Sequence, residues 1–392
     1  MKDTSKHIYL DYSATTPLHP EVAEVIRRHL DETYGNASSI HSFGRKAKVV
    51  LEESRETIAR FIGADTSEVF FTSGGTEADN HALIGTALAR RRTAGKDHVL
   101  VSSIEHHAVL DCADYLATLG FRVTRIPCDR QGYIEPSAVE QLLTERTAIV
   151  SVMHANNETG ALQPIREISR IVKERGITFH SDTVQTVGKI PVNMNENEIG
   201  IDLLPISAHK IYGPKGIGAI FIRKGTALDP LLHGGSQERK NRPGTENVPL
   251  IAGFAKAVEL AAPSMDNVYA QSEVFRKELL ELITKQCDGI ICHTVLDRSL
   301  PHILSISLDP ERYNIESETL LMGLDLRGVA VSSGSACTSG SVQPSHVLLS
   351  MGVDKRTAQS TVRFSFGKFT TIQEVVSAGE IFCSMVQSFR KQ

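Results

Sequence analysis

The feature that most constrains the fold is a regular alternation of short apolar runs with helical stretches between residues 68 and 223. Helical stretches such as 78–92 and 164–175 separate the runs. The runs themselves lie near Val69, Val99, Val123, Ile149, Ile177, Leu203 and Ile220. Continuous apolar strands of this kind are typical of a parallel sheet that helices cover on both faces. We therefore expect an α/β fold with a mostly parallel, seven-stranded sheet.

The character of the sequence changes after about residue 246, where long helices precede strands near Ile303, Val329 and Val362. A capping-box pattern over residues 371–374 opens the last helix. The sequence therefore predicts two domains, which a chain of 392 residues is long enough to build. The large domain spans residues 16–260. A smaller α+β domain combines residues 1–15 with residues 261–392.

Charge and composition exclude several classes of protein. The formal net charge of −4 gives no indication of binding to nucleic acid or to a membrane. We expect neither a signal segment nor a run long enough to cross a bilayer. The cysteines are scattered without a C-x-x-C pair, so neither a metal site nor a disulfide framework is expected. They are Cys112, Cys128, Cys287, Cys292, Cys337 and Cys383.

Lys210 lies in the segment 207–216, which directly follows the strand-like run 202–206. Ser207 and His209 precede it in this segment, and the glycine-rich residues 213–216 follow. An amine at the carboxyl end of a strand is well placed to form an imine with a carbonyl cofactor. An isolated lysine in such a position is more often a solvated residue beside a turn. The choice between the two interpretations depends on what other segments bring to the same place.

Two further segments favour the cofactor interpretation. Asp182 ends another apolar run, and Gly74, Gly75 and Thr76 connect a third run to a predicted helix. These groups fit one site for pyridoxal 5′-phosphate, with Lys210 forming the imine and Asp182 facing the ring nitrogen. Backbone N–H groups of the glycine-rich helix start would bind the phosphate. Ser207 and His209 would add side-chain donors to it.

The sequence resembles cysteine desulfurases of the NifS/IscS type, within the class V aminotransferase group of fold-type I pyridoxal phosphate enzymes. The resemblance extends from Tyr9 to Ser365, and its most specific match is the run 332–340 around Cys337. Cys337 alone among the cysteines is set among serines and glycines, as in a loop that reaches solvent. Other matching segments are Gly35-Asn36, His41, Glu105-His106, residues 153–160 and residues 242–247.

The resemblance implies a role for individual residues. His106 would stack on the cofactor ring and transfer protons, and Asn157 and Gln185 would hydrogen-bond the cofactor or substrate near the ring oxygen. Arg363 would bind the substrate carboxylate with its planar donors. Thr245 would reach the phosphate of a neighbouring subunit, which implies a homodimer. Without the resemblance, Arg363 could equally be the outward position of a strand, and His106 a helix N-terminal histidine.

The activity implied is conversion of L-cysteine to L-alanine with sulfur left as a persulfide on Cys337. A working thiol favours a reducing, cytoplasmic location. Selenocysteine lyase or another β-elimination remains an alternative, as does a non-catalytic component of sulfur assembly. The sulfur acceptor stays open among iron–sulfur scaffolds, nitrogenase maturation and tRNA or DNA thiolation. The sequence departs from the common family pattern at Ala208, at Pro205 and in a longer loop at 193–200.

Overall fold

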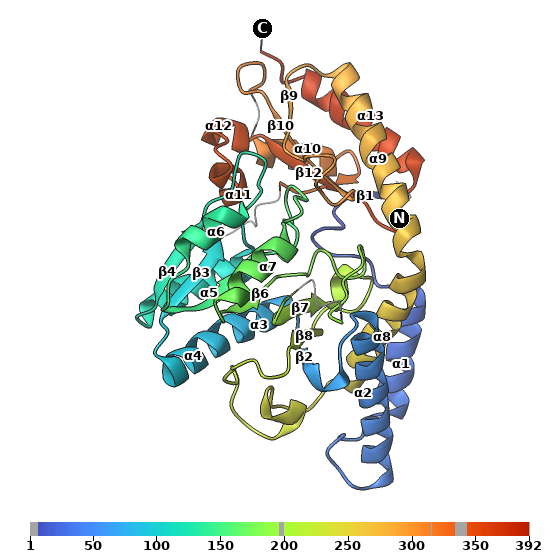
Figure 1. Cartoon of the computed structure of the whole chain (residues 1–392). Helices are drawn as coiled ribbons and strands as arrows, with labels where there is room; N and C mark the ends of the chain where they lie inside the picture. Colours follow the sequence, from blue (N-terminus) through green and yellow to red (C-terminus); the bar gives the residue numbers. More distant parts are fainter. Residues whose placement is uncertain (1–6, 196–199, 315, 334–342, 392) are drawn as a thin grey trace.

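The computed structural model describes residues 7–195, 200–314, 316–333 and 343–391. Its centre is a seven-stranded sheet that runs through the larger part of the molecule (Figure 1). In spatial order the strands are β2 (Val69–Thr72), β8 (Gly218–Ile222), β7 (Leu203–Ser207), β6 (Thr178–His180), β5 (Thr147–Ser151), β3 (His98–Ser102) and β4 (Arg122–Ile126). Six of these strands run in the same direction, and β8 runs in the opposite one. The predicted mostly parallel sheet is confirmed.

Helices cover both faces of the sheet because successive strand residues point to opposite sides. Leu100 and Val150 face one core, while Val99 and Ile149 face the other. The first core is closed by α2 (Ser42–Phe61), α6 (Pro136–Leu142), α7 (Ile165–Glu174) and α8 (Val248–Ala261). The second is closed by α3 (Gly75–Asn80), the π-helical η2 (His81–Gly85), α4 (Thr86–Ala94) and α5 (His107–Thr118).

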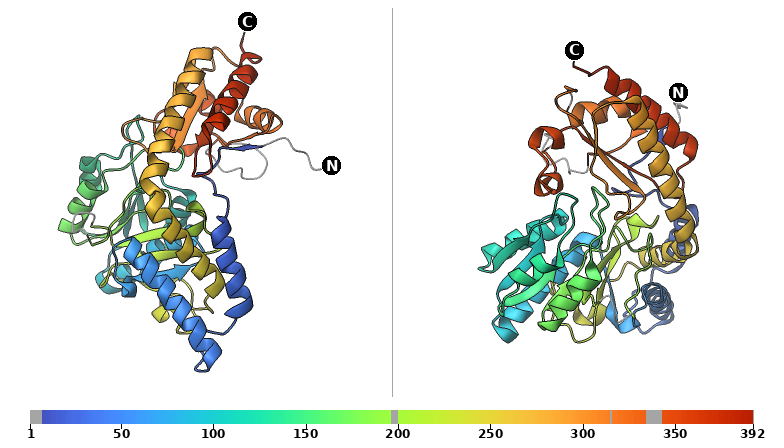
Figure 2. Two further views of the ribbon diagram at one scale, coloured as in Figure 1. Left: turned by 90° about the vertical axis from the view of Figure 1, so that its right-hand side faces the viewer. Right: turned by 45° about the horizontal axis from the view of Figure 1, so that its top comes forward.

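A long helical stretch joins the larger part of the molecule to the smaller part (Figure 2). It consists of α8, the 3₁₀ turn η5 (Ala262–Ser264) and α9 (Met265–Gln286). By length and composition this stretch could cross a membrane, which corrects the expectation that no run reaches that length. Half of its apolar window is buried inside the molecule, and α8 packs against α1 (Pro20–Glu32) and α2. This burial is typical of a core helix.

The smaller part contains an antiparallel sheet in the order β12 (Thr361–Ser365), β10 (Ile303–Leu308) and β9 (Ile290–Cys292). Strand β1 (Ile8–Tyr9) pairs with β11 (Val329–Ala330) beside it. The remaining helices here are α10 (Ser317–Asp325), α11 (His346–Ser350), α12 (Lys355–Ala358) and α13 (Ile372–Gln387). The capping box at the start of α13 is present, with Thr371 and Glu374 bonding each other's backbone N–H groups.

The hydrophobic core of the smaller part draws on both ends of the chain. Leu10 packs in one cluster with Phe275, Phe364 and Phe382. We therefore propose the division into residues 16–260 and residues 1–15 with 261–392 as the domain organisation. The separate cores on either side of the long helical stretch support it.

Candidate active site

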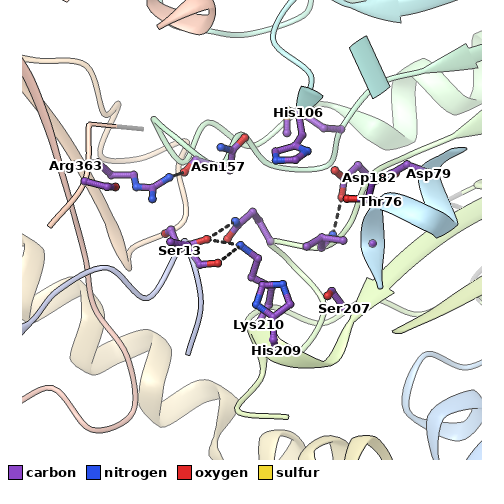
Figure 3. A pocket seen from close by; sticks show the side chains of 16 residues that line it. Ser13, Thr76, Asp79, His106, Asn157, Asp182, Ser207, His209, Lys210 and Arg363 are labelled. Carbon is purple, nitrogen blue, oxygen red and sulfur yellow. Dashed lines mark hydrogen bonds between the residues drawn. The ribbon is translucent and has the colours of Figure 1, made fainter. Parts of the chain in front are cut away.

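A cavity of about 350 Å³ lies at the carboxyl ends of the sheet strands, where it meets the N-terminal arm and strand β12. Ligand crevices in open α/β sheets occupy this position. Most of the predicted site residues line it, namely Gly75, Thr76, His106, Asn157, Asp182, Gln185, Ser207, His209, Lys210 and Arg363. Figure 3 shows Arg363 at one end, Asp182 and Thr76 at the other, and Lys210 and His106 facing each other across the space.

Lys210 reaches the cavity from η3 (Ala208–Lys210), a single turn that follows β7. Its Nζ donates hydrogen bonds to the carbonyl oxygens of Ser13 and Ala14, the latter at 2.8 Å. Burial, together with the Arg363 guanidinium, lowers the pKa of Lys210 to about 8. A substantial fraction of the amine is therefore neutral near physiological pH, and the neutral form attacks carbonyl groups.

Asp182 follows β6 and forms part of a buried acidic cluster. Its Oδ1 accepts a hydrogen bond from the backbone N–H of Val184 at 2.8 Å. Asp79 on α3 and Glu105 lie nearby, and all three carboxyl groups are buried. Burial raises the pKa of each, that of Glu105 to about 8. A positive group placed against Asp182 would lower its pKa again.

His180 lies beneath this cluster and is completely buried. Its Nε2 is 3.3 Å from Asp79 Oδ1, and its Nδ1 is 2.8 Å from Ser151 Oγ. Burial lowers the pKa of His180 to about 3. The order Asp79, His180, Ser151 resembles that of a hydrolase triad, but Asp79 Oδ1 and His180 Nε2 have no hydrogen-bond partner among the described residues. Ser151 is also fully buried, so no substrate reaches its hydroxyl.

His106 combines a position at a helix N-terminus with a place in the cavity lining. It is the N-cap residue of α5, where its Nδ1 accepts a hydrogen bond from the Ala108 N–H at 3.1 Å. The same ring lines the cavity. Burial lowers its pKa, so the ring is neutral with its proton on Nε2.

The start of α3 has an unusual backbone conformation and close packing. Gly74 adopts φ 157° and ψ −173°, a backbone region that is essentially restricted to glycine. A Cβ on Gly75 would come within 2.9 Å of Val184 Cγ2, so the backbone is packed closely there. Residues 75–94 form one continuous helical run through α3, η2 and α4, and its first residues, Gly75 and Thr76, line the cavity together with Ser207. The unpaired N–H groups of a helix N-terminus can bind an anion.

His209 belongs to the same end of the cavity, but its ring is already engaged with the N-terminal arm. Its Nδ1 lies 3.0 Å from Thr15 Oγ1. Burial lowers its pKa to about 4, so the ring is neutral. It therefore offers a neutral donor rather than a positive charge.

Arg363 is buried on β12, a strand without an outward-facing residue, so the alternative of a solvent-facing strand position is wrong. Its Nη1 donates to the carbonyl oxygen of Asn157 at 2.7 Å, and its Nη2 pairs with Asp11 Oδ1 at 2.9 Å. Its Nε is buried and has no hydrogen-bond partner among the described residues. A guanidinium held in this way retains donor capacity for a carboxylate.

Two residues singled out by the sequence, Thr245 and Ala208, do not line the cavity. Cys337 lies outside the described residues, although Ser332 of the same motif lines the cavity. Thr245 is exposed and does not line the cavity of its own chain. The methyl group of Ala208 is buried in the hydrophobic core rather than in the cavity. Among the described residues, no group of three or more His, Cys, Asp or Glu could hold a metal ion.

Ser13 and Asp79 also line the cavity but were not predicted as site residues. Asp79 lies three positions after Thr76, and residues spaced in this way share a helix face. That spacing was the available signal for Asp79. Ser13 contributes its carbonyl oxygen, which no side-chain pattern reveals.

Comparisons with known proteins agree with this geometry. The sequence model of the Aminotransferase class-V family matches residues 8–377, so the chain belongs to that family. It is 46% identical over 385 residues to the cysteine desulfurase IscS of Dictyoglomus turgidum, covering 98% of this chain and 96% of that protein. It is 42% identical over 388 residues to the cysteine desulfurase IscS of Methanosarcina thermophila, covering 98% and 93%. A solved NifS-like protein aligns with a TM-score of 0.90 at 37% identity, over 98% of this chain and 100% of that one.

Proposed function

We propose that the protein is a pyridoxal phosphate-dependent cysteine desulfurase. It converts L-cysteine to L-alanine and transfers the sulfur to Cys337 as a persulfide. The observation that carries this proposal is the convergence of Lys210, Asp182 and Arg363 on one cavity. The 46% identity to a cysteine desulfurase over nearly the full length supports the choice of substrate.

The cavity fits the proposed cofactor. Its volume of about 350 Å³ lies within the range of small-molecule sites. Lys210 would hold the aldehyde carbon, Asp182 the ring nitrogen, and the N–H groups at Gly75 and Thr76 the phosphate, with help from Ser207 and His209. When bound, pyridoxal phosphate supplies an electron sink for the substrate carbanion.

The chain's own groups account for the remaining chemistry. Arg363 binds the substrate carboxylate, while Asn157 and Gln185 position groups near the ring oxygen. Lys210 Nζ, with a pKa of about 8, accepts and returns a proton near neutral pH. His106 faces Lys210 across the cavity and provides a second proton-transfer group.

Sulfur transfer is redox-neutral. The Cys337 thiolate attacks the sulfur of the substrate, so an S–S bond forms as the C–S bond breaks. The substrate carbon takes a proton and leaves as L-alanine. A free thiol is only a few per cent ionised at neutral pH, so the reaction needs a proton acceptor close to the substrate. A reductant is required only to release the bound sulfur as sulfide.

We further propose a homodimer in which Thr245 contacts the cofactor phosphate of the partner subunit. Its exposure outside the cavity of its own chain supports this arrangement. Around the turn between α1 and α2, Tyr34, Ile40 and Phe43 are 70%, 91% and 52% exposed. Apolar groups exposed together in this way are typical of an interface. We also propose that the protein works in the cytoplasm. There it passes the sulfur to an acceptor such as an iron–sulfur scaffold.

The test is to incubate the purified protein with L-cysteine and a thiol reductant and to measure alanine and sulfide. We expect both products in equal amounts. Lys210→Ala should lose turnover, and borohydride reduction should attach the cofactor to the peptide containing Lys210. Attachment at Lys189 or Lys215 would contradict the assignment, and a protein that binds cofactor but forms no alanine would favour the non-catalytic alternative.

Cys337→Ser separates substrate binding from sulfur transfer. The variant should still change the cofactor spectrum when L-cysteine is added, because Arg363 and the ring-binding groups are intact. It should form no persulfide, since a hydroxyl is a far poorer sulfur acceptor than a thiolate. Normal sulfide release by this variant would instead indicate simple β-elimination.

A further inference from the structure

Lys189 joins the cavity to the smaller part of the molecule. Its Nζ lies 3.3 Å from Gln185 Oε1 and 3.1 Å from His302 Nε2. Gln185 lines the cavity, while His302 immediately precedes β10. Both partners are almost fully buried, at 5% and 4% exposure. The amine therefore connects two fixed groups from segments more than 110 positions apart in sequence.

The contacts of Gln185 give its amide a defined orientation. Its Nε2 donates to the Ser13 carbonyl oxygen at 3.0 Å, and that oxygen also accepts from Lys210 Nζ. An amide oxygen and nitrogen are nearly equal in size, so their partners decide which way the group points. An acceptor lies on the Ser13 side of the amide and a donor on the Lys189 side. Without Lys189, the amide oxygen would lose its donor and the group could rotate.

The surroundings of Lys189 favour a neutral amine. Burial lowers its pKa well below the ordinary value, and Lys210 and Arg363 lower it further. Other titratable groups lie near Lys189 or line, with it, a second cavity of about 40 Å³. They are Lys210, Arg363, His209, His302, Tyr12, Tyr212 and Tyr269. His302 is also neutral, because burial lowers its pKa well below the usual range. A neutral amine can donate to Gln185 Oε1 and accept from the His302 Nε2–H.

We propose that Lys189 is a positioning residue that holds the Gln185 amide with its NH₂ group toward the cavity and ties this orientation to His302. The inference rests on the proposed function, in which Gln185 lies near the ring oxygen of the cofactor. A donor held against that oxygen stabilises its deprotonated form and lowers its pKa. Lys189 thus acts on the cofactor only through Gln185.

The experiment is a pH titration of the visible absorbance of cofactor-loaded protein without substrate. In Lys189→Met, which keeps the length of the side chain but removes the amine, the midpoint should rise by about half a unit to one unit. One neutral hydrogen bond produces a shift of this size. Gln185→Leu should give a similar rise, and the double variant no further rise, because both changes remove the same interaction. Lys224→Met, at an exposed lysine, is the matched control and should leave the midpoint unchanged.

His302→Leu provides a second route if Lys189→Met does not fold. It removes the other partner of Lys189 and should raise the midpoint in the same direction, whereas His302→Gln should restore it. An unchanged midpoint in the folded variants, or additive shifts in the double variant, would overturn the inference alone. Wild-type protein that gains no visible absorbance from pyridoxal phosphate would overturn the proposed function and the inference with it.

Discussion

Glu105 illustrates how a single buried residue sets the pH response of the site. Its Oε1 accepts hydrogen bonds from Ser102 Oγ at 2.8 Å and from the Met153 N–H at 2.6 Å. Its Oε2 is buried and has no hydrogen-bond partner in the part of the chain that the structure describes. The residue is fully buried, and burial, with the Asp182 carboxylate adding to it, raises its pKa from 4.5 to about 8. At neutral pH the folded protein therefore keeps a proton on Glu105, which we assign to Oε2.

This proton makes stability fall as the pH rises. The folded state binds the proton more tightly than the unfolded state, so the contribution is full below pH 4.5 and is lost as the pH rises through about 8. Glu105→Gln mimics the protonated form and should reduce this loss. Each pKa unit corresponds to about 1.4 kcal/mol. Urea unfolding at pH 6 and pH 9 should show a smaller decrease for Glu105→Gln than for the wild type.

The exposed Glu278→Gln is the control for this prediction and should follow the wild type at both pH values. Asp79 and Asp182 also have raised pKa values, so they too make the free energy of unfolding fall as the pH rises. The difference between the wild type and Glu105→Gln therefore isolates the contribution of Glu105. Parallel decreases for wild type and Glu105→Gln would mean that Glu105 is ionised in the folded protein.

Site residues could be predicted from the sequence where a local pattern places a reactive side chain after an apolar run. Lys210 and Asp182 each end an apolar run, and the strands β7 and β6 bring them to one edge of the sheet. The partners of Asp79 and Lys189 could not be predicted in this way. His180 and His302 lie about one hundred positions away, and only the packed fold decides which of many polar residues become neighbours.

At the scale of elements, apolar runs located six strands of the large sheet because these strands are buried along their whole length and need no polar positions. The seventh, the edge strand β4, exposes Arg122 and Arg125 and was located by its apolar residues alone. An apolar run does not indicate the direction of a strand, so the antiparallel orientation of β8 could not be predicted. Pro205 within β7 is tolerated although it cannot donate to a ladder. Strand β7 pairs with β6 only at Leu203, so the missing N–H of Pro205 removes few hydrogen bonds between these two strands. The carbonyl of Pro205 instead accepts a hydrogen bond from Thr183 Oγ1 at 2.7 Å.

The segment before Thr245 is an unusual element. Glu238, Arg239 and Lys240 in η4 (Gln237–Lys240) have φ angles of 44°, 55° and 69°, a left-handed conformation that is costly without glycine. The Glu238 carboxylate compensates by binding Arg55 of α2 through two bonds of 2.6 and 2.7 Å. It also accepts the Phe71 N–H of β2 at 2.8 Å. One buried side chain thus fixes the segment to a helix and a strand.

Glu238→Gln should therefore destabilise the protein by about 3 kcal/mol, because the buried Arg55 guanidinium loses its buried counter-charge and keeps only the partly exposed Glu52, whose Oε2 lies 3.2 Å from Arg55 Nε. The double variant Arg55→Met/Glu238→Gln should lose less than the sum of the single changes, since no unpaired charge remains. Urea unfolding of the four proteins measures this cycle. Additive losses would show that Arg55 and Glu238 are stabilised independently.

At the scale of the whole molecule, Thr245 does not line the cavity of its own chain. The proposed contact between Thr245 and the phosphate therefore needs a second subunit. Thr245 is exposed, and it lies five residues beyond the left-handed segment. The exposed Tyr34, Ile40 and Phe43 offer an apolar surface for a second copy. Symmetric homodimers are the commonest assemblies of soluble proteins. The sequence alone could suggest this dimer through the family resemblance but not through any local pattern.

The dimer makes a prediction that a monomer cannot satisfy. Lys210→Ala lacks the imine-forming amine, and Thr245→Glu places a negative charge against the phosphate of the partner subunit, so each homodimer should be nearly inactive with L-cysteine. In a mixed dimer, one cavity combines the intact Lys210 of one subunit with the intact Thr245 of the other. Mixing the two variants under conditions that exchange subunits should therefore restore up to about one half of the wild-type activity per mixed dimer, since one of its two equivalent sites is complete. Sedimentation should show a dimer throughout, and a mixture that stays inactive despite subunit exchange would place Thr245 outside the partner's site.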